Sequence, residues 1–332
     1  MEVFQRVSQV GGRTGNPFRY VGGDNGKLLR KIGVWAGHDQ INAIQVWLAD
    51  DDPNTVGCAW GAYKEFEFRP GERIKELSLW PNIKGDRVTA IHFRTDQEER
   101  IFDHCMTEHS RRPGNEKPID VGSGICAGVL GNHDKNDNRP LIQSLAFVFL
   151  RPLDHARLKN VSYPTLTLDA APIEPVSLKG FSDHNGGSSP RNWKFADSYK
   201  VTRTSSWSLS VGAEVYGKVS VQASALEVVK VAGEFGWKLS GSGTHSASET
   251  AEDTLTWEVN GTLQPNESIR VTALTRRGSI CVPYTAVMEV VLKSRDTFSY
   301  PVQGQYTGLS YTDIEVVDEA AAERLKAVPA TA

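Results

Sequence analysis

The stretch WSLSVGAEVYGKVSVQASA, Trp207–Ala225, alternates apolar and polar residues without a break. A period of two residues predicts a β-strand with one apolar and one polar face. Strands of globular proteins are usually about 5–6 residues long, and this pattern runs about three times as far. The sequence therefore predicts a long amphipathic strand whose apolar face must be covered, either by the protein itself or by lipid.

The alternation pauses at Leu226–Gly233 and resumes at Glu234–Thr250, which predicts one long hairpin with its tip near Glu227–Gly233. A membrane-spanning strand needs about 9–11 alternating residues, but a lone hairpin leaves unpaired N–H and C=O groups in lipid. Two alternatives stay open: a hairpin packed over a β-sandwich with its apolar face inward, or strands of a barrel closed by several subunits. The predicted hairpin residues that would face lipid or form the tip are Trp207, Leu209, Val211, Ala213, Val215, Val219, Val221, Ala223, Leu226, Val228, Val229, Val231, Phe235, Trp237 and Leu239.

Length and composition limit the number of domains, the fold class and the kind of partner that this chain can have. The chain has 332 residues, which suggests two domains. Its net charge is −3, so no excess of positive charge indicates binding of nucleic acid. Serine, threonine and glycine are frequent and helical periodicity is rare, so we predict an all-β protein. The N-terminus lacks the basic start and apolar core of a secretory signal. We therefore expect a soluble cytoplasmic store that acts at extracellular or endosomal membranes after release.

In the first half of the chain, short apolar runs alternate with loops rich in glycine, asparagine and aspartate, which predicts a series of short strands separated by turns. These predicted strands are Lys31–Trp35, Ile41–Leu48, Glu65–Phe68, Ile74–Leu79, Val88–Arg94 and Leu145–Leu150.

Six motifs in the first half follow one another in a familiar order. They are VGGRTGNPF (Val10–Phe18), KIGVWAGHDQINAIQVWL (Lys31–Leu48), FRPGERIKELSLW (Phe68–Trp80), VTAIHFRTDQ (Val88–Gln97), SGICAGVLG (Ser123–Gly131) and LIQSLAFVFL (Leu141–Leu150). Their order resembles the jacalin-related lectins, and the resemblance implies a three-sheet β-prism that binds cell-surface glycans, with mannose-type sugars favoured.

The resemblance also implies the positions of the sugar-binding residues. Gly15 matches the glycine whose bare backbone N–H meets a sugar hydroxyl. Gln143 stands where that family normally has a sugar-binding aspartate. Asp134, Asp137 and Asn138, in an enlarged loop before it, are candidates to replace that carboxylate. The alternative is a prism that has lost sugar binding and serves as a scaffold.

Four motifs in the second half also fall in a familiar order: NVSYPTLTLDAAP (Asn160–Pro172), SWS (Ser206–Ser208), SICVPYTAVMEVVL (Ser279–Leu292) and GQYTGLSYTDIEV (Gly304–Val316). They resemble the elongated aerolysin-type β-module of natterin-like proteins. This resemblance implies that the hairpin after the Ser-Trp-Ser passage inserts into membranes, and that the chain is a homo-oligomer in the pore and a monomer or dimer in solution. We predict a lectin domain at 1–154, a pore-forming module at 155–318 and a tail at 319–332.

The prediction is a glycan-targeted β-barrel pore-forming protein that inserts its hairpin around 207–247. The alternative is a defence or storage lectin whose second domain is structural. No phosphate-binding loop, GxSxG or HExxH motif occurs, so we expect neither enzymatic activity nor a cofactor. His104 and His109, with Asp103 and Glu108 beside them, are the best metal candidates, but a solvated loop is the expected structure and no metal site is predicted.

Overall fold

The computed structural model describes residues 3–23, 26–49, 51–98, 100–108, 112–135, 140–164, 173–208, 216, 219–223, 230–231, 235–236 and 243–319. The regular elements of these residues are β-strands, which confirms the all-β prediction. In the same part of the chain no helix has the length and apolar character needed to cross a membrane.

The chain divides into two compact units. The first contains Met1–Leu158 together with Leu209–Val219 and Val287–Val302, and the second contains Lys159–Ser208, Ser220–Ala286 and Gln303–Ala332. The predicted domain boundaries after residues 154 and 318 stay predictions.

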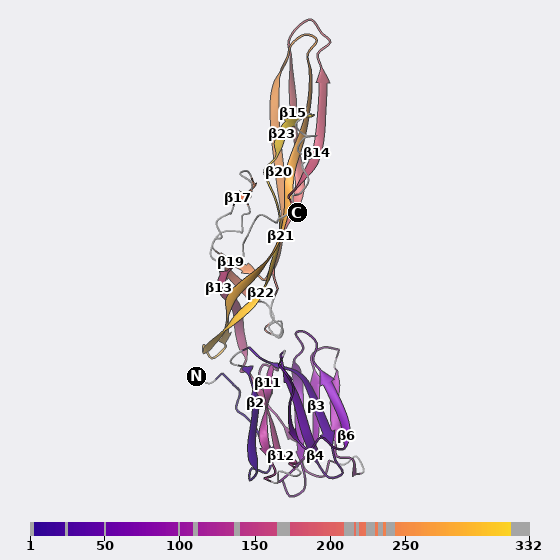
Figure 1. The fold of residues 1–332 in the computed structure, drawn as a ribbon, viewed down its shortest axis with the longest axis vertical. Coiled ribbons are helices and arrows are strands. Elements are labelled where there is room, and N and C mark those ends of the chain that lie inside the picture. The colour runs from indigo at the N-terminus through magenta and orange to yellow at the C-terminus, as the bar shows by residue number, and fades with distance from the viewer. Residues whose placement is uncertain are drawn as a thin grey trace. The chain divides into compact units, whose positions relative to one another are not determined.

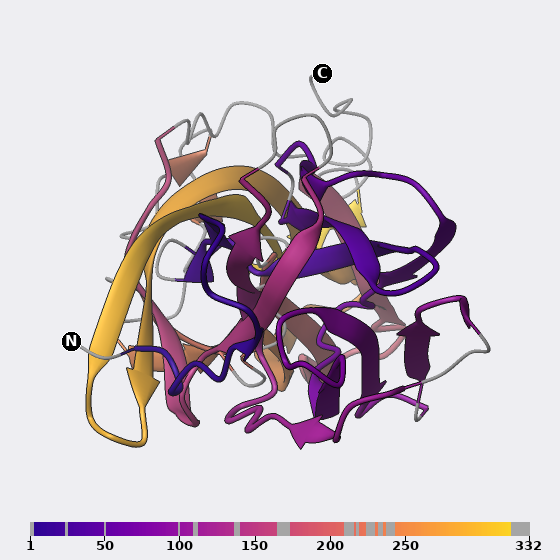
Figure 2. The ribbon, with the colours of Figure 1, turned by 90° about the horizontal axis from the view of Figure 1, so that it is seen from below.

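Three four-stranded antiparallel sheets form most of the first unit (Figure 1), the arrangement expected of a β-prism. Figure 2 shows the indigo and purple strands of this unit from below. The first sheet has the order β1-β12-β11-β2, the second β10-β7-β8-β9 and the third β5-β4-β3-β6. Their bounds are β1 (Val10–Gly11), β2 (Asn16–Val21), β3 (Leu29–Ala36), β4 (Ile41–Leu48), β5 (Asn54–Gly57), β6 (Ala62–Glu67), β7 (Ile74–Pro81), β8 (Val88–Thr95), β9 (Ile101–Cys105), β10 (Lys117–Pro118), β11 (Cys126–His133) and β12 (Ile142–Phe149).

One apolar core joins these three sheets. Ile44 comes from the third sheet, Phe93 from the second and Phe147 from the first, and all three side chains are buried in the same cluster. Phe93 stacks on Phe102 of the neighbouring strand with ring centroids 5.0 Å apart. Strands β4, β8 and β12 are buried along most of their length, so side chains of both faces are covered there. All six strands predicted for this half are present.

Nine further strands, several of them long, form one sheet ordered β19-β16-β13-β21-β22-β15-β20, with β14 and β23 also paired to β21. The bounds are β13 (Leu153–Ser162), β14 (Ile173–His184), β15 (Arg191–Trp207), β16 (Val219–Ala223), β19 (Gly243–Ser246), β20 (Ser248–Leu263), β21 (Ser268–Leu292), β22 (Thr297–Tyr311) and β23 (Glu315–Asp318). In the second unit Phe181 stacks on Phe195 at 5.3 Å, and Phe195 meets Trp257 edge-on at 5.6 Å. These aromatic rings cover the apolar faces of the paired strands.

The prediction of an unbroken strand over Trp207–Ala225 is wrong. Strand β15 ends at Trp207, Ser208 and Tyr216 lie outside any strand, and β16 begins only at Val219. Tyr216 belongs to the predicted polar face, yet it is buried and its hydroxyl accepts a hydrogen bond from the Tyr300 hydroxyl at 3.2 Å. A phenol ring can occupy a core when its hydroxyl has a partner, so one tyrosine overrides the local alternation. Nine of the predicted hairpin residues lie outside the described part of the chain: Leu209, Val211, Ala213, Val215, Leu226, Val228, Val229, Trp237 and Leu239.

Two short ladders within the predicted hairpin share a single register. Ser220 of β16 pairs with Ser246 of β19, and each is 13 positions from residue 233. Strands β17 (Lys230–Val231) and β18 (Phe235–Gly236) pair Lys230 with Gly236, each three positions from residue 233. Both ladders therefore have the register of one hairpin centred at residue 233, the last residue of the predicted tip.

The prediction of one apolar face and one polar face is confirmed in β16. Val219 and Val221 are buried, Ser220 is half-buried and Gln222 is exposed. In this state the apolar face is covered by the protein, as expected for the packed hairpin.

Candidate functional site

The predicted sugar-binding residues meet at one end of the sheet β1-β12-β11-β2. Gly15 directly precedes β2, Asp134 directly follows β11, and Gln143 is the second residue of β12. The β11–β12 pairing shifts register between Asn132 and His133, opposite Gln143. The described residues Gly15, Asp134 and Gln143 thus come together, whereas Asp137 and Asn138 lie outside the described part of the chain.

The position of Gly15 has no room for a side chain. A Cβ placed there would overlap the carbonyl oxygen of His133 and lie 2.8 Å from Gln143 Oε1. The carbonyl oxygen of Gly15 accepts a hydrogen bond from Asn132 Nδ2 at 3.2 Å, which ties this loop to β11. A glycine therefore allows the loop backbone to approach the strand ends directly.

A chain of hydrogen bonds fixes the polar groups of the site. Arg87 Nη1 donates to Asp134 Oδ1 at 2.7 Å, and Gln143 Nε2 donates to the same oxygen at 2.8 Å. Gln143 Oε1 accepts from Thr14 Oγ1 at 3.3 Å. The Asp134 side chain keeps 19% of its surface exposed. A carboxylate oxygen such as Asp134 Oδ2 can accept a hydrogen bond from a ligand hydroxyl.

Gln143 therefore holds the carboxylate of Asp134 in place. Asp134 provides the negative charge at this end of the sheet, and Gln143 orients it together with Arg87. Arg87 was not among the sequence-predicted site residues, because it lies 47 positions from Asp134 in a turn of a different sheet. A carboxylate and an amide side by side can accept hydrogen bonds from sugar hydroxyls and donate to them.

Gly15→Ala should weaken binding of a mannose-type glycan about tenfold, as the loss of one hydrogen bond of about 1.4 kcal/mol implies. The added methyl group pushes the loop away from His133 and Gln143. Titration calorimetry with the full-length chain measures the effect. Gly180→Ala is the control, since a Cβ at Gly180 has open space around it and, as at Gly15, the backbone is not left-handed. Equal affinity in wild type and Gly15→Ala would contradict the prediction.

The sequence made the histidine and acidic side chains around residues 103–109 its best metal candidates, in an expected solvated loop. Asp103 and His104 lie instead in strand β9. His104 Nε2 lies 2.9 Å from the Ala62 carbonyl oxygen, and Asp103 pairs with Arg112. His109 lies outside the described residues. Glu108 instead approaches His38 and Asp39, which the sequence analysis did not single out.

Trp207 lies in the protein interior, not at a solvent interface. Its side chain is buried, its Nε1 donates to the Tyr163 hydroxyl at 2.9 Å, and its ring centroid is 5.0 Å from that of Tyr306. Burial raises the pKa of Tyr163 to about 12, so this hydroxyl stays neutral at physiological pH. Trp207 is thus placed in the described state as the packed-hairpin alternative predicts.

Trp207→Phe should destabilise the second unit by about 1–2 kcal/mol, because it removes one buried hydrogen bond and part of the ring contact. A lower melting temperature in calorimetry measures this loss. Trp60→Phe is the control, because Trp60 is an exposed tryptophan of the first unit. A melting temperature equal to that of wild type would show that the Tyr163 contact contributes nothing.

Comparison with known proteins agrees with this architecture. The family described as Jacalin-like lectin domain matches residues 7–137. The crystal structure of lamprey immune protein superposes with a TM-score of 0.80 and 32% sequence identity, over 96% of this chain and 98% of that chain. A Malaysian banana lectin (18% identity, TM-score 0.35) covers 44% of this chain and 96% of its own. A mannose-binding jacalin-related lectin from Ananas comosus (19% identity, TM-score 0.35) covers 44% of this chain and 98% of its own. A search of curated protein sequences gives no match.

These features define an all-β protein of two units with an N-terminal jacalin-like lectin domain. Since it is 32% identical to lamprey immune protein across nearly the full length of both chains, the chain belongs to the same family as lamprey immune protein.

Proposed function

We propose that this protein binds mannose-type glycans at a cell surface through its lectin domain and then forms an oligomeric β-barrel pore. The site at Gly15, Asp134 and Gln143 concentrates the protein at the membrane. The hairpin around residues 207–247 then leaves its packed position and inserts. The proposal includes no enzymatic step.

The observation that carries the proposal is the common register of the two hairpin ladders, together with the two distinct faces of β16. Ser220 and Lys230 both pair symmetrically about residue 233, as in one uninterrupted hairpin. Val219 and Val221 form an apolar face, and Gln222 lies on the opposite polar face. A strand with these two faces can meet lipid on one side and water on the other once neighbouring subunits satisfy its edges.

The relationship to lamprey immune protein supports a defensive role. We propose that the protein acts outside the cell or in endosomes, on membranes that carry foreign or altered glycans. The lectin domain would raise the local concentration of the second unit and so favour oligomerisation.

A second candidate is a lectin whose second unit is purely structural. The burial of Trp207, Val219 and Val221 favours it, because the apolar face of the hairpin is already covered in the described state. The two candidates make opposite predictions about membranes: only the first requires this face to leave the protein interior.

Dye release from liposomes tests the proposal. Vesicles made with cell-derived glycosylated lipids are mixed with the full-length protein, with and without free mannan, across pH 4.5–7.5. Each sample is also run on a detergent gel to detect a heat-labile oligomer. We expect release together with an oligomer, and inhibition of both by mannan. Vesicles of the same phospholipids without glycans are the matched control.

Release and oligomerisation that do not depend on the glycan would contradict the targeting role of the lectin domain. Binding to glycosylated vesicles without release or oligomer, under every condition, would contradict pore formation and establish the structural-domain lectin.

A further inference from the structure

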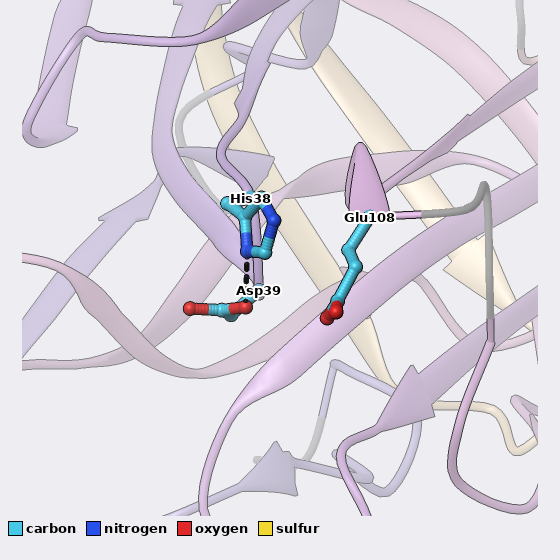
Figure 3. A group of neighbouring side chains, drawn as sticks. All are labelled: His38, Asp39 and Glu108. Atoms are coloured by element: carbon cyan, nitrogen blue, oxygen red, sulfur yellow. Dashed lines mark hydrogen bonds and ion pairs between the residues drawn. The ribbon is translucent and has the colours of Figure 1, made fainter.

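Three side chains of metal-binding type meet away from the sugar site. His38 and Asp39 belong to the turn between β3 and β4, and Glu108 follows β9. One potential ligand atom from each lies within 4.8 Å of the other two. Figure 3 shows the His38 ring beside the Asp39 carboxylate, with the Glu108 side chain extending toward the same space.

Backbone hydrogen bonds hold the two segments together independently of any ion. The Gly37 amide donates to the Gln40 carbonyl at 2.8 Å and closes the turn. The Glu108 amide donates to the His38 carbonyl at 2.9 Å, and the Thr107 amide donates to the Gly37 carbonyl at 2.8 Å. A Cβ at Gly37 would overlap the Asn42 amide, so the turn is also packed closely against β4. The ligand side chains therefore start from fixed backbone positions, which lowers the ordering cost of binding.

The donor set and its charge suit a transition metal. One imidazole nitrogen with two carboxylate oxygens is typical of zinc-class ions, whereas calcium takes oxygen ligands almost throughout. His38 and Asp39 are 65% and 76% exposed, so an ion from solvent can reach them. The two carboxylates beside the imidazole carry negative charge, which favours a positive ion at this place.

Space for further ligands adjoins the cluster. His38 and Asp39 also line a pocket of about 310 Å³, together with Cys58 and the exposed Trp60. Three protein ligands leave at least one coordination position of a tetrahedral ion open to water. The pocket provides room for that water on the side where His38 and Asp39 face it.

We propose that His38, Asp39 and Glu108 form a binding site for one divalent transition-metal ion of the zinc class. Asp39 Oδ1 lies 2.6 Å from His38 Nδ1, closer than the roughly 3.3 Å between ligands of a tetrahedral zinc ion. A small rotation of these two exposed side chains admits the ion in place of the shared proton. The bound ion links the β3–β4 turn to the segment after β9.

Titration calorimetry of the EDTA-treated, full-length protein with ZnCl₂ under reducing conditions tests this site. We expect one ion per chain at low micromolar affinity, and at least tenfold weaker binding in His38→Ala and in Glu108→Gln. Bound Co²⁺ should show visible d–d absorption in wild type and lose it in both variants. The control is His155→Ala: His155 also pairs with a preceding aspartate, Asp154, at 2.8 Å, but among the residues that the structure describes no third ligand joins this pair.

The two variants change exposed or half-buried side chains, and unchanged melting temperatures in the absence of metal confirm that they fold. Absence of Zn²⁺ binding by wild type would overturn the proposal. Equal affinity and stoichiometry in wild type, His38→Ala and Glu108→Gln would assign the ion to other residues and would also overturn it.

Discussion

Gln222→Lys is expected to shift the conductance of the proposed pore toward anions, with the anion-to-cation permeability ratio rising several-fold. Gln222 lies on the exposed face of β16, next to the buried Val221, and this face would line the lumen after insertion. Each subunit would add one positive charge to the lumen, and rings of charged side chains control the selectivity of a pore. Since Gln222 is exposed in the described state, the substitution should leave the fold of the free protein intact.

The measurement is the reversal potential of a planar bilayer across a KCl gradient. Thr256→Lys is the matched control: Thr256 is an exposed polar residue between buried Leu255 and Trp257 in β20, outside the hairpin. It should release dye as wild type does and leave selectivity unchanged. A pore whose selectivity does not respond to Gln222→Lys, or responds equally to Thr256→Lys, would be inconsistent with β16 lining the lumen.

Asp134→Ala should reduce glycan affinity about 100-fold or more, because hydrogen bonds to a charged group contribute about 1.5–3 kcal/mol each. The substitution removes the acceptor that binds both Arg87 and Gln143, so it also releases the groups that shape the site. Calorimetric titration with a mannose-type oligosaccharide measures the loss. Dye release from glycosylated vesicles should fall in parallel. The release caused by each oligomer that has already formed should stay the same as in wild type.

Asp51→Ala is the control for loss of an aspartate ion pair in the same unit, since Asp51 binds Lys27 at 2.7 Å in a different loop. It should retain wild-type affinity. If both variants bind glycan as wild type does, Asp134 is not the acceptor of the site and the sugar binds elsewhere on the prism.

The sequence predicted the strands of the lectin unit well. Ile41–Leu48 was predicted with the bounds that β4 has, and Lys31–Trp35 lies within β3. Both strands have buried apolar faces and short loops at their ends, so local side-chain direction and turn chemistry are enough to define them. The motif order then led to the correct three-sheet arrangement.

The sequence was less successful along Trp207–Ala225. Its alternation correctly assigned Val219 and Val221 to one face and Gln222 to the other. It did not anticipate that the strand stops at Trp207 or that Tyr216 is buried against Tyr300. The alternation pattern treats Tyr216 as a polar residue that should face solvent. Its hydroxyl instead forms a hydrogen bond with Tyr300, 84 positions away, so the side chain can be buried.

The sequence by itself determined the β class of the protein and the faces of its strands, and it predicted the glycine of the candidate sugar site. These depend on neighbours along the chain: side chains alternate across a strand, and a residue without Cβ permits close backbone approach. Only the tertiary structure decided which polar groups act together. Arg87 meets Asp134 across 47 positions, and Glu108 meets His38 across two sheets. Such contacts depend on how the sheets pack around a shared core, which no local pattern specifies.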